Sequence, residues 1–507
     1  MTARAFWISL STAAALALAA AATAQTPNTA LTVALANDPT SLFMPRAADR
    51  TASNAAWSLY DSLIWVNDDG DLTPALATKW DASSDGKSYT FTLRRGVTFH
   101  NGEVFDAQSV VATWETGKDP KNGYADLYKA VTDIKVVDPY TVTMTLAKPD
   151  ALFLTNIANA WAMVPPKYIR SVGIDAFAQR PVGTGPFVFG ERRSGDRIVM
   201  NANRQYWDRG MPKVSRVTYR IIPDLNTRAA AVRTGEIDIA NRLTTEVAAG
   251  LRNQARVSVI SYPNDRVYYV GFKNMGAGKD SPLEDKRVRQ ALNLAVNRPG
   301  IVRGIFGGAA NQVSGFLVQG NLGFDANLKP YPYDVERAKK LLADAGFEKG
   351  FSISMGCPTD AYTNINEVCL SVQRDLEKVG VDVSLEFKTS NTFWSKANYG
   401  AVGAMFVDSW SSAVGEALPR LAGALIPENF YSGWNDPEIV KQVNAISATM
   451  DRRARATLYT RLAQYMYDNP PFIYLYQPVI FEAVTSRVQG YKPRSAEEYY
   501  LKNVSVR

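Results

Sequence analysis

Histidine and cysteine are nearly absent from this chain. Its 507 residues include one histidine, His100, and two cysteines, Cys357 and Cys369. A zinc site of His and Cys ligands, or a Ser-His-Asp triad, would have to rest on that single imidazole. The sequence therefore lacks the usual parts of most hydrolase mechanisms, and we expect no cofactor and no metal site.

Long runs of one charge are also missing. The 56 Lys and Arg residues and 49 Asp and Glu residues give a net charge of +7, spread along the chain. No polybasic segment of the kind that binds phosphate backbones is present, so we expect no nucleic-acid partner. With 46% apolar and 21% charged residues, the composition is typical of a folded globular protein. The length suggests two or three domains with room for a cleft between them.

The one long apolar run lies at the N-terminus. Arg4 precedes an apolar stretch at 13–22, and small residues follow up to Ala24, which is the pattern of a secretory signal peptide. We predict cleavage after Ala24. No later segment approaches the about 20 apolar residues that span a bilayer, and the leader has no cysteine that could carry a lipid. We therefore expect a free, soluble protein in the periplasm.

The two cysteines are twelve positions apart in the sequence. In an oxidising compartment this spacing favours a disulfide between Cys357 and Cys369. The alternative is two separately buried thiols. A catalytic cysteine has little support, because the single histidine is more than 250 residues away in the sequence.

Apolar and polar side chains alternate at 89–93 and 140–146, which predicts half-buried strands. The segments 334–346 and 365–380 have a helical apolar repeat and end at glycine. Alternation then resumes at 381–387. Helix, glycine and strand in that order predict an α/β fold.

Several motifs carry a family resemblance. The segment 93–110, LRRGVTFHNGEVFDAQSV, resembles a signature of the extracellular solute-binding proteins of peptide, nickel and opine ABC importers, known as family 5. Other segments look like landmarks of the same family, in the family's order, at 181–187, 226–236, 287–293 and 333–342. The resemblance covers nearly the whole mature chain, and several ordered motifs are more specific than any one of them.

The resemblance implies a periplasmic-binding-protein fold, in which two α/β lobes joined by a hinge close on a ligand and a subdomain is inserted. After a signal peptide at 1–24, the expected ranges are 25–68, 179–268 and 485–507 for lobe I, 69–178 for the inserted subdomain and 269–484 for lobe II. Such a receptor returns its cargo unchanged, so we expect no enzyme activity. We also expect a monomer whose partner is an inner-membrane ABC permease.

In this family the residues after a tryptophan in the second lobe often line the pocket, and the corresponding segment here is 408–416, DSWSSAVGE. The resemblance implies that Trp410 forms a flat wall, that Ser411 and Ser412 hydrogen-bond a polar ligand, and that Glu416 accepts an amine. The alternatives are core packing for Trp410 and a salt bridge within the lobe for Glu416.

Two features of the usual peptide-binding pattern are missing. Peptide-binding relatives commonly have an aspartate where this chain has Ala413, and the carboxylate-binding arginine of dipeptide binders has no counterpart near Thr359. The segment after Trp410 is instead similar to the branch that includes glutathione-importer binding proteins.

Further candidates for ligand contact are Ser53, Asn54, Tyr124 and Trp394. His100 lies in a turn motif of the family, and we expect it to be structural. Nickel held directly by histidine is therefore disfavoured, whereas a metal carried inside an organic chelate stays open.

The sequence thus predicts a periplasmic binding protein that captures a short peptide or peptide-like solute by lobe closure and delivers it to a permease. One alternative is a receptor for an opine, a sugar-opine or a metal chelate. Another is a secreted hydrolase that uses paired carboxylates such as Asp408 and Glu416. A periplasmic chaperone or sensor with the same fold is a third.

Overall fold

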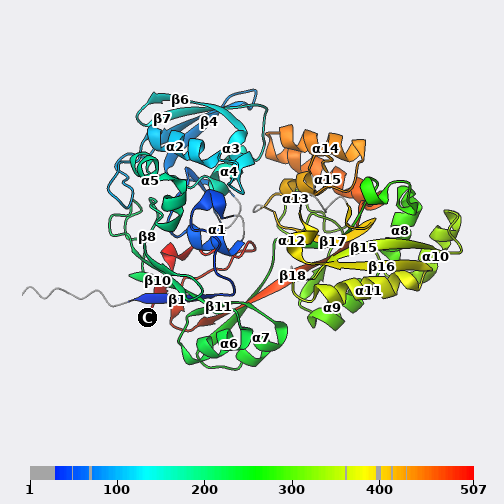
Figure 1. The fold of residues 1–507 in the computed structure, drawn as a ribbon. Coiled ribbons are helices and arrows are strands. Elements are labelled where there is room, and N and C mark those ends of the chain that lie inside the picture. Colours follow the sequence, from blue (N-terminus) through cyan, green and yellow to red (C-terminus); the bar gives the residue numbers. More distant parts are fainter. Residues whose placement is uncertain are drawn as a thin grey trace, which may run out of the picture.

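The computed structural model describes residues 29–47, 50–67, 71–359, 362–395, 401–412, 415–429 and 431–507. The expected signal peptide at 1–24 lies outside these ranges. Two α/β bodies stand side by side in Figure 1, and the long strand β18 (Phe472–Thr485) runs from one into the other. We call residues 29–263 and 479–507 the first body and residues 267–476 the second body. The lobe boundaries expected from the resemblance stay predictions.

The first body consists of a mixed sheet with helices against it. Its elements are β1 (Ala30–Leu35), α1 (Arg50–Ala56), β2 (Ile64–Val66), β3 (Leu72–Pro74), β8 (Phe187–Arg193), β9 (Arg197–Ala202), β10 (Arg216–Ile221), α6 (Leu225–Thr234), β11 (Ile239–Leu243), α7 (Thr245–Leu251), β12 (Val257–Pro263), β19 (Val488–Gln489) and β20 (Ser505–Val506).

A separate four-stranded antiparallel sheet, in the order β4-β5-β7-β6, is inserted into the first body. The inserted elements are β4 (Ala77–Ala82), β5 (Ser88–Leu93), α2 (Ala107–Gly117), α3 (Ala125–Lys129), β6 (Val131–Asp138), β7 (Thr141–Leu146), α4 (Phe153–Ala160) and α5 (Pro166–Gln179). The two strands predicted from alternation are β5 and β7. Every second side chain of each is buried, as the alternation requires.

The second body has helices around a sheet that contains parallel strands. Its elements are β13 (Val267–Phe272), α8 (Lys286–Ala295), α9 (Arg298–Phe306), β14 (Ala310–Gln312), α10 (Val335–Asp344), β15 (Phe351–Pro358), α11 (Ile365–Glu377), β16 (Val381–Lys388), α12 (Ser390–Phe393), β17 (Met405–Trp410), α13 (Leu418–Leu425), α14 (Pro437–Ala448), α15 (Arg452–Asp468) and the start of β18.

The helix boundaries in the second body follow from local chemistry. The Asp334 side chain accepts a hydrogen bond from the Arg337 N–H at 2.9 Å and caps α10. Gly346 and Gly380 have φ values of 89° and 85°, so the chain reverses after α10 and α11 in a conformation that disfavours other residues. The expected order of helix, glycine and strand is confirmed by α11, Gly380 and β16.

The structure contains the expected disulfide. It joins Cys357, near the end of β15, to Cys369 in α11, and both residues are fully buried. The bond therefore fixes α11 against the strand that it covers.

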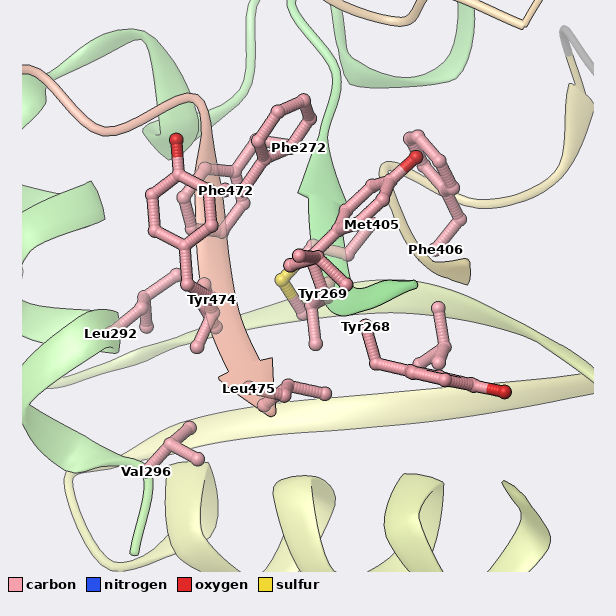
Figure 2. Packing of buried hydrophobic residues seen from close by; sticks show 14 of the residues in the cluster. Tyr268, Tyr269, Phe272, Leu292, Val296, Met405, Phe406, Phe472, Tyr474 and Leu475 are labelled. Atoms are coloured by element: carbon pink, nitrogen blue, oxygen red, sulfur yellow. The ribbon is translucent and has the colours of Figure 1, made fainter. Parts of the chain in front are cut away.

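A large apolar core fills the second body. Figure 2 shows Tyr269 of β13, Phe472 and Tyr474 of β18 and Leu292 of α8 packed in one cluster. The Tyr269 and Phe472 ring centroids are 4.5 Å apart, which is close contact for aromatic rings. This packing fixes the position of β13 and β18, the two strands that lead into the first body.

One continuous sheet joins the two bodies, in the order β16-β15-β17-β13-β18-β11-β1-β10-β9-β8. The first residues of β18 pair with β13, as in Tyr476 opposite Tyr268. Its later residues pair with β11 and β12, as in Ala483 opposite Ala240 and Val259. The chain crosses into the second body at 264–266 and returns at 477–478, and Asn264 N–H donates to the Pro478 carbonyl at 2.9 Å between these crossings.

Glu482 is a buried carboxyl group on β18. It accepts hydrogen bonds from the Tyr262 hydroxyl at 2.9 Å and the Tyr491 hydroxyl at 2.7 Å. Burial raises its pKa from 4.5 to about 7, despite these bonds. Between these two values the unfolded chain releases the Glu482 proton while the folded protein retains it, so rising pH favours unfolding.

We therefore expect the free energy of unfolding of the wild type, relative to Glu482→Gln, to fall by roughly 3 kcal/mol between pH 4.5 and 7, at about 1.4 kcal/mol per pKa unit. Urea unfolding across this pH range measures the difference. Glu246→Gln on α7, where the side chain is exposed, is the control. A wild-type curve parallel to that of Glu482→Gln would contradict the assignment.

Candidate functional site

Several of the candidate residues lie at one edge of the sheet in the second body. Strands β15, β16 and β17 are parallel, so their carboxyl ends lie at one edge of the sheet. Strand β13 is antiparallel to β17 and begins at the same edge, with Tyr268 opposite Ser409. Ligands of open α/β sheets bind outside the carboxyl ends of the parallel strands. Two of the predicted site residues, Trp394 and Trp410, follow or end strands at this edge.

An aromatic wall lines this edge. The Tyr268 and Tyr476 rings are stacked with centroids 4.7 Å apart, and Tyr362 meets Tyr268 edge-on at 4.9 Å. Trp394 lies beyond Tyr362, with ring centroids 5.7 Å apart. We call Tyr268, Tyr362, Trp394 and Tyr476 the aromatic wall. Of these four, sequence reasoning found only Trp394.

Asp408 holds the wall together. Its Oδ1 accepts from the Tyr362 hydroxyl and its Oδ2 from the Trp394 indole N–H, both at 3.1 Å. Oδ1 also accepts from the Ser409 N–H at 2.7 Å. The Asp408 side chain is buried. Its carboxylate is therefore committed to orienting two rings of the wall.

Glu416 forms a salt bridge within the second body, which was one of the two alternatives for this residue. Its Oε1 lies 2.8 Å from a guanidinium nitrogen of Arg455, and both side chains are less than a tenth exposed. Arg455 also donates to the carbonyls of Thr449 at 2.8 Å and Met450 at 3.0 Å. Burial raises the pKa of Tyr459, and the nearby Glu416 carboxylate raises it further. Through Arg455, Glu416 is thus joined to the loop between α14 and α15.

Trp410 and its two serines lie at the end of β17. The Trp410 indole is half-buried against Gly423 of α13, and its ring meets that of Tyr431 edge-on at 5.8 Å. Ser411 is half-buried, whereas Ser412 is buried and donates its hydroxyl to the Glu416 carbonyl. Ala413 lies outside the described residues.

The candidate ligand-binding side chains of the first body form hydrogen bonds or packing contacts within that body. The Ser53 hydroxyl donates to the Arg50 carbonyl at 3.1 Å, and the Asn54 side-chain amide donates to the Glu497 carbonyl. Both side chains are buried. Tyr124 is half-buried against the cores of the first body and the inserted sheet.

A polar junction connects the bodies at the crossing segment 264–266. Arg50 of α1 forms an ion pair with Asp265 at 3.0 Å, and Asp265 also accepts from the Ser412 N–H at 3.3 Å. Beside it, Glu497 accepts from Arg242 at 2.7 Å and from the Asn264 amide at 3.0 Å. Sequence reasoning missed this junction.

The junction fixes several charges. Burial alone would raise the pKa of Glu497, but the Arg242 and Arg50 guanidinium groups hold it below its usual range. Burial alone would lower the pKa of Arg50, whereas Asp265 and Glu497 raise it. The Glu497 carboxylate and the Arg50 and Arg242 guanidinium groups are therefore ionised near pH 7 and stabilise one another's charge.

The bodies also meet at the inserted sheet. The Ala151 N–H donates to the Ser447 carbonyl at 2.8 Å, and the Tyr89 hydroxyl lies 3.5 Å from the Met450 sulfur. Leu152 is buried in the core of the second body. Figure 1 shows α14 and α15 on the side of the second body that faces the inserted segment. The aromatic wall and the polar junction thus lie in a molecule whose bodies touch at two separate places.

His100 has a structural position. Its Nδ1 accepts from the Gly183 N–H at 3.2 Å and its Nε2 bonds to the Gly185 carbonyl at 3.0 Å. Burial lowers its pKa to about 4, so the ring is neutral near pH 7. A surface hollow of about 840 Å³ lies beside it, lined in part by Tyr168, Arg180 and Arg192. None of the predicted ligand residues lines this hollow.

Within the described ranges, no group of three or more His, Cys, Asp or Glu side chains is placed to hold a metal ion. In the same part of the chain, no helix has both the length and the apolar character needed to cross a membrane.

Comparison with known proteins identifies the family. Residues 71–431 match the model of the bacterial extracellular solute-binding proteins, family 5 Middle. The chain belongs to this family. The family and the α/β periplasmic-binding-protein fold expected from the motifs are therefore confirmed.

The chain is similar to glutathione-binding proteins named GsiB. It is 28% identical to that of Salmonella paratyphi A and 29% identical to that of Salmonella typhimurium, covering 90% of this chain and 91% of each relative. Among solved structures, HbpA2 from Haemophilus parasuis has a TM-score of 0.84 at 25% identity, covering 94% of this chain and 100% of HbpA2. DppA from Helicobacter pylori, in complex with the peptide STSA, has a TM-score of 0.80 at 24% identity and covers 94% and 98%.

The role assigned to Asp408 is testable by Asp408→Asn. An amide has one acceptor oxygen in place of two, so at least one buried donor among Tyr362, Trp394 and the Ser409 N–H loses its partner. We expect the free energy of unfolding to fall by about 1–3 kcal/mol, the usual cost of a buried unsatisfied group. Urea unfolding measures this loss.

Asp133→Asn on β6, where the side chain is exposed, removes the same charge without a buried partner and should change stability by less than about 0.5 kcal/mol. If both variants were equally stable, Asp408 would not hold the wall.

Proposed function

We propose that this family 5 solute-binding protein captures a short peptide or peptide-like solute at the aromatic wall and delivers it to an inner-membrane ABC permease. The observation that carries the proposal is similarity over 90% of the chain to proteins named for binding glutathione, which is itself a short peptide. The aromatic wall supports it, since its two half-buried rings, Tyr362 and Trp394, offer apolar contact to peptide side chains while their polar atoms stay bonded to Asp408. The buried rings of Tyr268 and Tyr476 pack behind them.

The pocket that we propose combines Trp394 and Trp410 as flat contacts with the Ser411 hydroxyl as a polar contact. Ser412 and Glu416 hold this surface in place. The Ser412 hydroxyl donates to the Glu416 carbonyl, and the Glu416 carboxylate pairs with Arg455. Ser53, Asn54 and Tyr124 shape the opposite side from the first body. Closure of the two bodies then buries the ligand, and affinity depends on contacts made in the closed state.

Several further parts of the proposal concern the setting. The protein acts in the periplasm after cleavage following Ala24, as a monomer, and returns its cargo unchanged.

The hydrolase alternative has lost its carboxylate pair, because Asp408 holds two rings and Glu416 is bound to Arg455. The neighbours AgaA from A. tumefaciens, in complex with agropinic acid, and NikZ from Campylobacter jejuni, in complex with Ni(L-His), share the fold at 24% and 23% identity. That likeness does not favour an opine or a chelate for this chain.

Thermal unfolding with a panel of compounds tests the ligand class. Glutathione or tri-alanine at about 100 times its dissociation constant should raise the free energy of unfolding by about 2.7 kcal/mol. Mass spectrometry should recover the compound unchanged. Agropinic acid and nickel-histidine serve as the comparison, and stabilisation by either of these alone, or turnover of a peptide, would contradict the proposal.

Trp410→Ala tests the pocket. We expect glutathione to bind at least ten-fold more weakly, a loss of about 1.4 kcal/mol, because the exposed part of the indole no longer contacts it. Isothermal titration below the melting temperature measures this on folded protein. Trp80→Ala, which removes a half-buried indole from the inserted sheet, is the matched control. Unchanged affinity in Trp410→Ala would remove this residue from the pocket.

A further inference from the structure

Arg266 occupies a central place between the bodies. It is the last residue of the crossing segment 264–266, directly before β13, and it is half-buried. One of its guanidinium nitrogens, Nη1, donates to the Ser409 hydroxyl at 2.9 Å and to the Ser409 carbonyl at 3.3 Å. The guanidinium carbon lies 5.6 Å from the centre of the Tyr362 ring. The group is therefore fixed beside the aromatic wall.

The Arg266 guanidinium forms no direct ion pair within the described ranges, although Asp265 and Glu497 act on it at longer range. Across the described ranges, no carboxylate lies within ion-pair distance of its guanidinium, and no protein group accepts from Nε or Nη2. Asp265, its neighbour in sequence, is directed instead to Arg50 and the Ser412 N–H. Asp408, which shares the wall, accepts from Tyr362 and Trp394.

Three other arginines of the region differ in this respect, whereas the buried Arg420 has no ion pair in the described part of the chain and donates to the carbonyls of Phe316 and Asp265 and to the Asn321 amide oxygen. Arg50 is paired with Asp265, and Arg242 with Glu497, at 3.0 and 2.7 Å. In the second body, Arg455 is paired with Glu416 at 2.8 Å. A cation that is partly removed from water without an anion is unfavourable. An anion supplied by a ligand would remove that cost in the bound state only.

We infer that Arg266 binds a carboxylate of the ligand. The inference rests on the proposed function, and it narrows the cargo to short peptides with at least one free carboxylate. Ser409 accepts hydrogen bonds from Nη1, and the Tyr362 ring lies against one face of the guanidinium, so its plane is fixed. The other edge of the group then presents Nε and Nη2 as a pair of parallel donors. Such a pair matches the two oxygens of a carboxylate, a geometry that lysine does not offer.

The carboxylate could be that of the peptide C-terminus or that of an acidic residue, and chemical probes separate the two. Isothermal titration would use glutathione, glutathione amidated at its glycine carboxyl, and an analogue that lacks the γ-glutamyl α-carboxylate. In the wild type, one of the two modified probes should bind at least 30-fold more weakly than glutathione. In Arg266→Gln, that probe and glutathione should bind with affinities within about three-fold of each other, because the group that distinguishes them has no partner.

Variants complete the test. Arg266→Gln should weaken glutathione binding at least 30-fold, and Arg266→Lys, which keeps the charge without the paired donors, should fall between it and the wild type. Arg303→Gln, on the exposed surface of α9, removes the same charge and should bind within two-fold of the wild type. Circular dichroism of unliganded protein checks folding. If Arg266→Gln fails to fold, Arg266→Lys with the same three probes decides the matter, since it should reduce the discrimination between glutathione and the amidated or shortened probe.

The outcomes separate the two proposals. If the wild type binds glutathione and Arg266→Gln binds it equally well, the inference is wrong and the proposed function stands. If Arg266→Gln loses affinity equally for every probe, Arg266 only supports the fold of the site, which also overturns the inference. If the wild type binds neither glutathione nor tri-alanine, the proposed function fails, and the inference fails with it.

Discussion

The hydrogen bonding of β18 to both bodies is the constraint on which the rest of the structure depends. Its first residues pair with β13 and its later residues with β11 and β12. Both crossings of the chain therefore belong to one ribbon of sheet, so paired strands join the two bodies. The aromatic wall and the polar junction lie beside this ribbon.

Three carboxylates near the proposed site form hydrogen bonds or ion pairs with other protein groups. Asp408 orients two rings, Glu416 binds Arg455, and Asp265 binds Arg50. Under the proposed function, a ligand between the bodies would therefore meet aromatic faces, hydroxyl groups and the Arg266 guanidinium, which has no direct ion pair within the described ranges. This balance favours an anionic peptide over a cationic one, because an ammonium group would find few acceptors that are not already bonded.

The sequence predicted local structure well where the pattern was local. The unit of α11, Gly380 and β16, the strands β5 and β7 and the disulfide all depend on residues close together in the chain. The salt bridge of Glu416, one of the two alternatives given for that residue, was also within reach, whereas the ligand contact expected of Trp394 stays a prediction. Tyr268, Tyr362 and Tyr476 were not, since they form one wall only after three distant segments meet.

The polar junction was unpredictable for the same reason. Glu497 meets Arg242 from a position 255 residues later in the chain, and no motif marks either residue. Arg266 carries no signal in the sequence, because the lack of a direct ion pair within the described ranges depends on which groups the fold brings around it.

The shared strand also sets an order of assembly. Ribosomes make the chain from its N-terminus, so β11 is synthesised more than 200 residues before β18, its partner in the sheet. Until that partner arrives, β11 has an unsatisfied edge and Arg242 lacks Glu497. The first body cannot complete its fold while the nascent chain is still short. A protein built in this way stays incompletely folded until nearly all of its chain has been synthesised.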